Sequence, residues 1–227
     1  MNTAFANATI LSLLLAAMPT ALRASETGTA LFVDIVTDLI RQDQALQGVR
    51  LEILNATPRE SACGSIQDGD LVAHYCGADR TIYTTTSTLA NVQSSFGTAG
   101  LRYLAAHELA HGRQHAVTGY SRALVWSSVL DELQADCIAG AYLRRTYGYD
   151  ADSASAEPIQ RFAYSIGDRG FWQKDWHGNP RLRLAALNRG LRKGDPASCL
   201  SSSRFNYASL LEQGQSWLQR LQQLRQR

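Results

Sequence analysis

The feature that most restricts the fold is a pair of histidines four residues apart inside an apolar stretch. Residues 101–112 read LRYLAAHELAHG, in which His107 and His111 enclose Glu108 in an H-E-x-x-H pattern. Such a run predicts a buried helix, which we place at about residues 99–117. Positions four apart lie one turn apart on the same helix face, so both imidazoles can reach a single metal ion.

Glu108 projects in a different direction from the two histidines but stays close to them. It could take a proton from a metal-activated water without itself binding the metal. Zinc suits such a site, because two neutral imidazole nitrogens and one carboxylate leave a tetrahedral position open for water. The five-residue pattern also occurs by chance in many helices, so a third ligand must be found elsewhere in the chain.

His115 continues the same helical series but cannot complete the site. It lies eight residues beyond His107, which is about 12 Å along a helix axis, whereas zinc–nitrogen bonds are only about 2.0–2.1 Å long. The longer metzincin pattern also fails, because it needs Gly at position 114 and His at position 117. This chain has Gln114 and Val117 there.

A second helical run, expected at about residues 122–147, supplies a better candidate. Its segment DELQAD places Glu132 and Asp136 four residues apart, on one helix face. If this helix packs against the first, Glu132 could bind the metal. Asp136 could then accept a hydrogen bond from the far ring nitrogen of a ligand histidine and fix its tautomer. A solvated helix face is the alternative, but unpaired carboxylates would be costly among the surrounding apolar residues, which are Leu130, Leu133, Ala135, Ile138 and Ala139.

The four cysteines favour disulfide bonds. Cys63, Cys76, Cys137 and Cys199 are an even number, and no two of them have C-x-x-C spacing, which disfavours a cysteine zinc knuckle or redox motif. Of the three possible pairings, we expect Cys63 with Cys76, closing a short loop, and Cys137 with Cys199, tying a helix to the C-terminal part. Free buried thiols are the alternative. Disulfides would indicate an oxidising compartment.

The first residues have the composition of a secretory signal peptide. Residues 1–24 contain no acidic residue and one basic residue, Arg23, and the apolar run at 10–18 is far shorter than the roughly 20 residues that span a bilayer. We expect cleavage near Ala24 and a single domain over residues 25–227, with a buried N-terminal helix as the alternative. This predicts a periplasmic or secreted protein without a stable transmembrane anchor after cleavage.

Composition and charge exclude several classes of protein. Of the 227 residues, 45% are hydrophobic and 19% are charged, which excludes a disordered or fibrous chain. The 22 basic and 20 acidic residues give a net charge of +2. Nucleic-acid binding normally needs a strongly basic face, so we expect no nucleic-acid partner.

The hydrophobic pattern predicts a helix-rich α+β domain with a small β-sheet. Glycine and small polar residues at 94–98 are expected to precede the long helix, and residues 148–156 are expected to form a surface loop. The order of the strands does not follow from the pattern. We expect helices at 29–46, 99–117, 122–147, 158–166, 180–191 and in the tail from Ala208, and strands at 49–54, 71–75 and 81–85.

Four segments carry a family resemblance, and ELQADCIAG is the most specific of them. They are HELAHGRQ at 107–114, ELQADCIAG at 132–140, ACG at 62–64 with YCGADRTIY at 75–83, and HGNPRLR at 177–183. The chain thereby resembles the bacterial neutral zinc metallopeptidases, with a gluzincin-type arrangement. The resemblance implies a zincin-like domain with two active-site helices. It also implies a Zn²⁺ ion held by His107, His111 and Glu132, with Glu108 as the general base.

Three further residues are candidates for contact with a substrate. His177, in an expected loop, could stabilise the negative charge that develops on the scissile carbonyl oxygen, or could simply be exposed. Arg183 could orient that loop or bind a substrate carboxylate. His74 is expected at the rim of a cleft, where a strand edge could pair with an extended peptide. Tyr103 is expected in the core.

These observations together predict a zinc metallopeptidase that acts on a peptide or protein substrate. Zinc would polarise the carbonyl and lower the pKa of its water to about 7, while Glu108 would take the proton and pass it to the leaving amine. Two alternatives remain open. One is a metal-stabilised but catalytically silent binding or chaperone-like module of the cell envelope, and the other is a regulator of envelope assembly that uses the fold as a scaffold.

Overall fold

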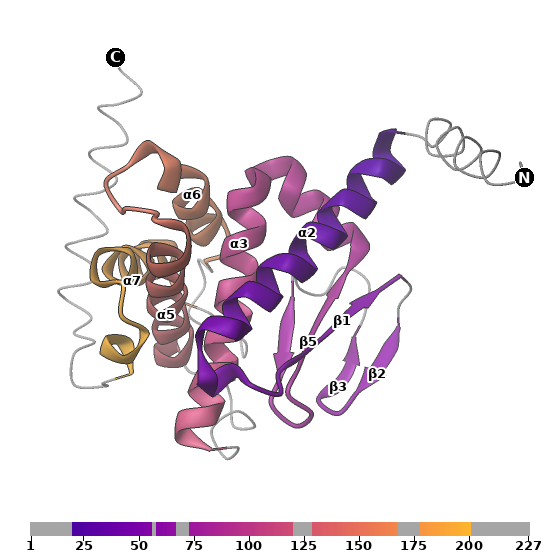
Figure 1. Cartoon of the computed structure of the whole chain (residues 1–227), viewed down its shortest axis with the longest axis horizontal. Coiled ribbons are helices and arrows are strands. Elements are labelled where there is room, and N and C mark those ends of the chain that lie inside the picture. The colour runs from indigo at the N-terminus through magenta and orange to yellow at the C-terminus, as the bar shows by residue number, and fades with distance from the viewer. Residues whose placement is uncertain (1–19, 56–57, 67–72, 120–128, 168–177, 201–227) are drawn as a thin grey trace, which may run out of the picture.

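The computed structural model describes five stretches of the chain, which contain the proposed metal ligands and their neighbours (Figure 1). Part of the expected signal peptide (residues 1–19), His177 and the expected tail helix from Ala208 lie outside them. No helix in the described stretches combines the length and the apolar character needed to cross a membrane. The described residues are 20–55, 58–66, 73–119, 129–167 and 178–200.

Helices make up most of the described chain, which confirms the prediction of a helix-rich α+β fold. Short 3₁₀ helices follow α2, precede α6 and follow α7. The α-helices are α2 (Thr20–Gln42), α3 (Thr86–Thr118), α5 (Val129–Tyr147), α6 (Glu157–Ser165) and α7 (Pro180–Lys193), and the 3₁₀ helices are η1 (Gln44–Leu46), η2 (Ala154–Ala156) and η3 (Pro196–Cys199).

The sheet is small and mixed. Its order is β1-β5-β4, with β1 parallel and β4 antiparallel to the central strand β5, while β2 and β3 form a separate antiparallel hairpin that the sequence pattern did not predict. In the register of the sheet, Ile82 of β5 lies between Leu51 of β1 and Tyr75 of β4. The strands are β1 (Arg50–Leu54), β2 (Arg59–Ser61), β3 (Gly64–Ile66), β4 (His74–Cys76) and β5 (Thr81–Thr85).

The start of α3 differs from the sequence prediction. A helical segment already begins at Thr86, directly after β5, and the predicted break within residues 94–98 is a kink at Gly97, whose φ of 64° and ψ of −163° divide α3 into two helical segments. Glycine tolerates this left-handed φ because it has no Cβ. The side chain of Thr85 caps the helix by accepting a hydrogen bond from the backbone N–H of Thr88 at 3.0 Å. Strand and helix therefore follow each other without a loop.

Helix α3 lies at the centre of the molecule, between the sheet and the group formed by α5, α6 and α7 (Figure 1). It packs against α2, α5 and α6 as well as against β4 and β5. The largest fully buried side chains come mainly from α2, α3 and α5, and they include Phe32, Leu39, Leu101, Tyr103, Leu109, Leu133, Ile138 and Tyr142.

Helices α5 and α7 meet backbone to backbone through a pair of glycines. A Cβ atom on Gly190 would collide with the carbonyl oxygen of Cys137, and one on Gly140 would collide with the carbonyl oxygen of Leu187. Only glycine allows so close an approach. Gly140 is the last residue of the segment ELQADCIAG, so this segment carries both a packing surface and the two acids of interest.

The structure contains two disulfides, with the pairing expected from the spacing of the cysteines. Cys63 is bonded to Cys76 at the end of β4, and Cys137 of α5 is bonded to Cys199 of η3. All four cysteines of the chain are therefore oxidised. The first bond ties the β2–β3 hairpin to the sheet, and the second ties the end of the described chain to α5.

Candidate metal centre

Two histidines of α3 and one glutamate of α5 face one another. The Nε2 atom of His107 lies 3.2 Å from Oε2 of Glu132, and the Nε2 atom of His111 lies 3.5 Å from Oε1 of the same carboxylate. One donor atom from each residue lies within 4.8 Å of the other two. His107 and Glu132 are buried, whereas 20% of the His111 side chain is exposed, so the cluster meets solvent at His111.

The spacing of these donor atoms suits zinc. With bonds of about 2.0–2.1 Å, the ligand atoms of a tetrahedral zinc ion lie roughly 3.4 Å apart, and the distances of 3.2 Å and 3.5 Å lie on either side of that value. Two imidazole nitrogens and one carboxylate are also the donor set of many catalytic zinc sites, in which water takes the fourth position. The residues present therefore fit a zinc ion.

Asp136 lies behind His107, on the side away from Glu132. Its Oδ1 atom is 3.0 Å from Nδ1 of His107, although the N–H bond of the ring is not aligned with it well enough for a good hydrogen bond. Burial would lower the pKa of His107, but the contacts with Asp136 and Glu132 raise this pKa to about 10. Metal binding at this imidazole therefore requires the loss of a proton that the metal-free protein holds.

Arg183 and Tyr103 hold Asp136 in place. The Nε and Nη2 atoms of Arg183 donate hydrogen bonds to Oδ2 and Oδ1 of Asp136 at 2.9 Å and 3.0 Å, and the hydroxyl of Tyr103 donates to Oδ1 at 2.6 Å. Burial would raise the pKa of Asp136, but Arg183 and His107 keep it below its usual value. Arg183 is only 2% exposed, a position that suits holding Asp136 rather than binding a substrate carboxylate.

Burial and neighbouring charges also have opposite effects on the pKa of Glu132. Burial would raise the pKa of its carboxyl group, but the neighbouring His111, His107 and Arg183 hold this pKa well below its usual value. The nearest Arg183 nitrogen lies 3.6 Å from Oε2 of Glu132. Glu132 is therefore ionised near neutral pH, as a metal-binding carboxylate must be.

Gln114 is a site residue that the sequence analysis missed. Its Oε1 atom lies 2.9 Å from Nδ1 of His111, and its Nε2 atom donates hydrogen bonds to the carbonyl oxygen of Asp131 at 2.7 Å and to Oε1 of Gln134 at 3.0 Å. The available signal was its position three residues after His111, because side chains three apart meet on a helix. In the sequence, Gln114 stands out only as the last residue of the motif HELAHGRQ and as a mismatch to the glycine of the metzincin pattern, and neither feature assigns it a role.

Glu108 lies next to the ligands but outside their group. It is 6% exposed, and its carboxylate has no hydrogen bond or ion pair with any other described residue. The half-buried His74 of β4 lies near enough for the charges of Glu108 and His111 to affect it. Burial lowers the pKa of His74, the charge of Glu108 opposes this, and the net effect keeps the imidazole neutral near pH 7.

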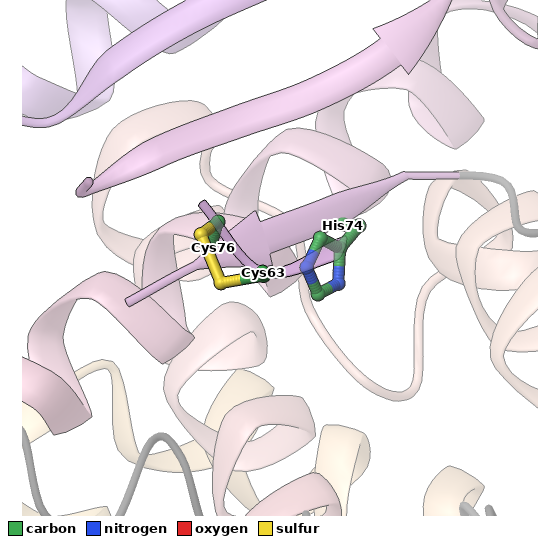
Figure 2. A group of neighbouring side chains, drawn as sticks. All are labelled: Cys63, His74 and Cys76. Carbon is green, nitrogen blue, oxygen red and sulfur yellow. A yellow bond between two sulfur atoms is a disulfide. The ribbon is translucent and has the colours of Figure 1, made fainter. Parts of the chain in front are cut away.

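A second group of possible metal ligands contains His74 with Cys63 and Cys76, whose donor atoms also lie within 4.8 Å of one another. Figure 2 shows that the two sulfur atoms are joined in a disulfide beside the His74 ring. A metal-binding cysteine must be a thiolate, so this group offers a single imidazole in the oxidised protein. Of the two clusters among the described residues, the one around Glu132 is the one whose donors are not held in a disulfide.

Comparison with known proteins connects this geometry to a family. The model of the family described as "Putative neutral zinc metallopeptidase" matches residues 33–202. The chain belongs to this family. The match includes His107, His111, Glu132 and the residues that support them, and it confirms the resemblance seen in the sequence motifs.

Two relatives of this family member come from Escherichia coli and Mycobacterium bovis. The chain is 28% identical over 149 residues to the uncharacterized protein YpfJ of Escherichia coli (strain K12). This match covers 55% of this chain and 52% of YpfJ. The chain is 30% identical over 155 residues to the uncharacterized protein Mb2605 of Mycobacterium bovis, and this match covers 55% of this chain and 53% of Mb2605. The chain thus spans about half the length of these relatives. No solved structure matches it.

Proposed function

We propose that this chain is a zinc metallopeptidase that hydrolyses peptide bonds. The observation that carries the proposal is the convergence of two imidazoles from α3 and one carboxylate from α5, at separations that suit a tetrahedral zinc ion. Membership of a family described as zinc metallopeptidases supports both the metal and the class of reaction.

His107, His111 and Glu132 would hold the zinc ion through their Nε2 atoms and a carboxylate oxygen. When bound, zinc supplies a Lewis acid that polarises a carbonyl and lowers the pKa of a water molecule to about 7. Glu108 would act as general base, accepting a proton from the attacking water and delivering it to the leaving amine. Its lack of a fixed partner among the described residues leaves its carboxylate free for both transfers.

The remaining buried groups would keep the ligands in position. Asp136 would orient His107, and Arg183 would balance the negative charge of Asp136 and Glu132, because unpaired buried carboxylates are costly. We therefore propose a positioning role for Arg183. His177 stays a prediction as the group that stabilises the carbonyl oxygen, since it lies outside the described residues.

The edge strand β4 is the proposed contact with the substrate backbone. Within the described residues, β4 pairs with β5 on one side only and packs against α3, the helix that carries the histidines. An extended peptide can add to such an edge through backbone hydrogen bonds. His74 on this strand would then lie beside the peptide, which is how we propose that it contributes to substrate binding.

The two disulfides support a proposal about location. Disulfides persist in oxidising compartments such as the bacterial periplasm or the extracellular medium, and all four cysteines of this chain are paired. We propose that the protein acts there, on peptide or protein substrates. The signal peptide over residues 1–24 and the single domain over residues 25–227 remain part of this proposal.

Replacement of the proposed base tests the function directly. The variant Glu108→Gln should bind zinc like the wild type but cleave a peptide library about 100 to 10,000 times more slowly, because the amide cannot accept the proton. His107→Ala should lose zinc. Bound zinc measured by atomic absorption and cleavage measured by mass spectrometry separate the two effects.

Glu157→Gln is the matched control, because this glutamate is partly exposed, lies on α6 rather than on the helices of the cluster, and forms a surface pair with Arg161. It should change neither zinc content nor cleavage. If Glu108→Gln cleaves as fast as the wild type, the peptidase proposal is wrong. A wild type that binds zinc but cleaves nothing, with Glu108→Gln indistinguishable from it, would instead support the catalytically silent module.

A further inference from the structure

We propose that Gln114 is a positioning residue that sets the tautomer of His111 and holds its ring against Glu132. The proposal rests on the proposed function only in that it treats the His107–His111–Glu132 cluster as a metal site. The hydrogen bonds that carry it belong to the protein alone.

The orientation of the Gln114 amide follows from its partners. One of them is the backbone carbonyl of Asp131, 2.7 Å from Nε2, and a carbonyl oxygen can only accept a hydrogen bond. The nitrogen of the amide must therefore point to α5, where it also reaches Oε1 of Gln134 at 3.0 Å. With the nitrogen held on that side, the amide oxygen faces His111.

The amide oxygen in turn determines which nitrogen of His111 carries a proton. Oε1 of Gln114 lies 2.9 Å from Nδ1 of His111 and has no proton to donate, so Nδ1 must be the donor. The Nε2 atom then presents its lone pair towards Glu132, whose Oε1 is 3.5 Å away. A tautomer with its only proton on Nε2 would leave two lone pairs facing each other across the shorter contact, 2.9 Å at Nδ1, rather than across the longer one, 3.5 Å at Nε2, and is disfavoured.

The hydrogen-bond chain continues beyond Gln114 to a covalent anchor. Gln134 of α5 donates from Nε2 to the carbonyl oxygen of Cys199 at 3.1 Å. Cys199 is fully buried and is bonded to Cys137, one turn further along α5. This series of hydrogen bonds thus connects His111, a proposed metal ligand on α3, to α5 and η3. The ring of His111 is therefore held by groups that have little freedom to move.

A neutral acceptor suits this position for reasons of charge. Three carboxylates lie in or beside the cluster, those of Glu108, Glu132 and Asp136, and the buried cation Arg183 lies against the last two. A fourth carboxylate behind His111 would add an uncompensated negative charge in a buried region. The amide of Gln114 orients the imidazole without that cost.

Three variants of the full chain test the proposal. Gln114→Met removes the acceptor, whereas Gln114→Glu keeps an acceptor for the Nδ1 proton and loses only the two hydrogen bonds that Nε2 donates to α5. Gln160→Met is the matched control, because Gln160 is another buried glutamine whose Nε2 donates to a backbone carbonyl, of Ala151, and to a side-chain oxygen, of Asn188, both at 2.7 Å.

The first measurement is the nitrogen-15 NMR spectrum of the His111 ring in the metal-free protein. The wild type, Gln114→Glu and Gln160→Met should show a protonated Nδ1, whereas Gln114→Met should populate the tautomer protonated on Nε2. The second measurement is zinc affinity by competition with a chelating dye. Gln114→Met should bind zinc about 10 to 100 times more weakly than the wild type, and Gln160→Met should bind it like the wild type.

Several outcomes would overturn the proposal. A wild type whose His111 carries its only proton on Nε2 contradicts it without any variant. It is equally contradicted if Gln114→Met keeps the Nδ1 proton and the zinc affinity of the wild type, or, should that variant not fold, if Gln114→Glu loses the Nδ1 proton. If the tautomers follow the expectation but no form binds zinc, the proposed function fails while the role of Gln114 in orienting His111 stands.

Discussion

At the scale of single residues, two buried aspartates are each held by one tyrosine and one arginine. The carboxylate of Asp136 receives hydrogen bonds from Tyr103 and from an arginine, Arg183. The carboxylate of Asp43 receives a hydrogen bond from Tyr142 at 2.6 Å and forms an ion pair with Arg113. In each case the tyrosine and the arginine satisfy charge and hydrogen bonding together, which buried carboxylates require. The Asp43 group joins the chain after α2 to α3 and α5.

Asp43 provides a test of stability against pH. Burial would raise the pKa of its carboxyl group, but Tyr142, the backbone N–H of Ala45 and Arg113 hold it below its usual value. A carboxyl group with a lowered pKa in the folded state stabilises the protein above its unfolded pKa, and this contribution is lost as the pH falls through the folded pKa. Asp43→Asn should therefore lower the free energy of unfolding by about 2 kcal/mol at neutral pH.

Urea titrations of wild type and variant, from neutral pH down through about pH 3, measure this difference. The difference in the free energy of unfolding between wild type and Asp43→Asn should become smaller as the pH falls. Asp38→Asn is the control, because Asp38 is more than half exposed and forms only a surface pair with Arg41, which contributes less than about 1 kcal/mol. A gap that widens as the pH falls would contradict the assignment.

At the scale of elements, the approach of α7 to α5 decides whether the buried charges can meet. The glycine pair lets the two helix backbones touch, and the same contact places Arg183 of α7 within hydrogen-bonding distance of Asp136 of α5. A longer separation between the helices would leave both groups without their partner. The packing surface and the metal cluster are therefore parts of one structural unit.

Enlarging one of these glycines should disturb that unit. In Gly140→Ala, the added Cβ atom would overlap the carbonyl oxygen of Leu187 and lie only 2.8 Å from the backbone nitrogen of Leu191. Backbone atoms cannot swing away, so the helices must separate, at a cost of about 1–3 kcal/mol in the free energy of unfolding. Thermal unfolding followed by circular dichroism measures the loss.

The matched control is Gly28→Ala in α2. There the added Cβ atom meets only the side-chain end of Gln93, which can rotate away, and alanine is the better helix former by about 1 kcal/mol. This variant should be as stable as the wild type or more so. If Gly140→Ala is equally harmless, the close contact between α5 and α7 is not needed for stability.

At the scale of the whole molecule, two disulfides close loops of different length. The cysteines of the Cys63–Cys76 bond are 13 residues apart, and those of the Cys137–Cys199 bond are 62 residues apart. The longer loop includes α6, η2 and α7. A crosslink restricts the unfolded chain more when it closes a longer loop, so the second bond should contribute more to stability.

We expect the double variant C137A/C199A to lose about 4 kcal/mol of unfolding free energy, and C63A/C76A to lose about 3 kcal/mol. Only the first should also weaken zinc binding, because Cys199 accepts the hydrogen bond from Gln134 that supports the Gln114 amide. Urea unfolding and dye competition measure the two effects. Equal zinc affinity in the two double variants would show that the Cys199 carbonyl does not need its disulfide to stay in place.

Local patterns in the sequence were sufficient to predict most of the helices and the candidate ligands. The spacing of His107 and His111, and that of Glu132 and Asp136, places each pair on one helix face whatever surrounds the helix. The same holds for the start of α7, where Asn179 caps the helix and Pro180 occupies its first position. Such features depend on residues within one or two turns, so the sequence alone expresses them.

Other features were decided only when distant segments packed together. Gln114 donates hydrogen bonds to groups of α5, and Asp136, the partner of Arg183, lies 47 residues before it in the sequence. The break that the sequence predicted over residues 94–98 is confined in the structure to Gly97. The strand order β1-β5-β4 likewise depends on which edges are covered. A hydrogen bond or an ion pair between two elements forms only after both have packed together. The hydrophobic pattern of one element does not indicate which residues of another element it will contact. The types of donor near the candidate metal centre were thus determined by sequence, and the groups that orient them by tertiary structure.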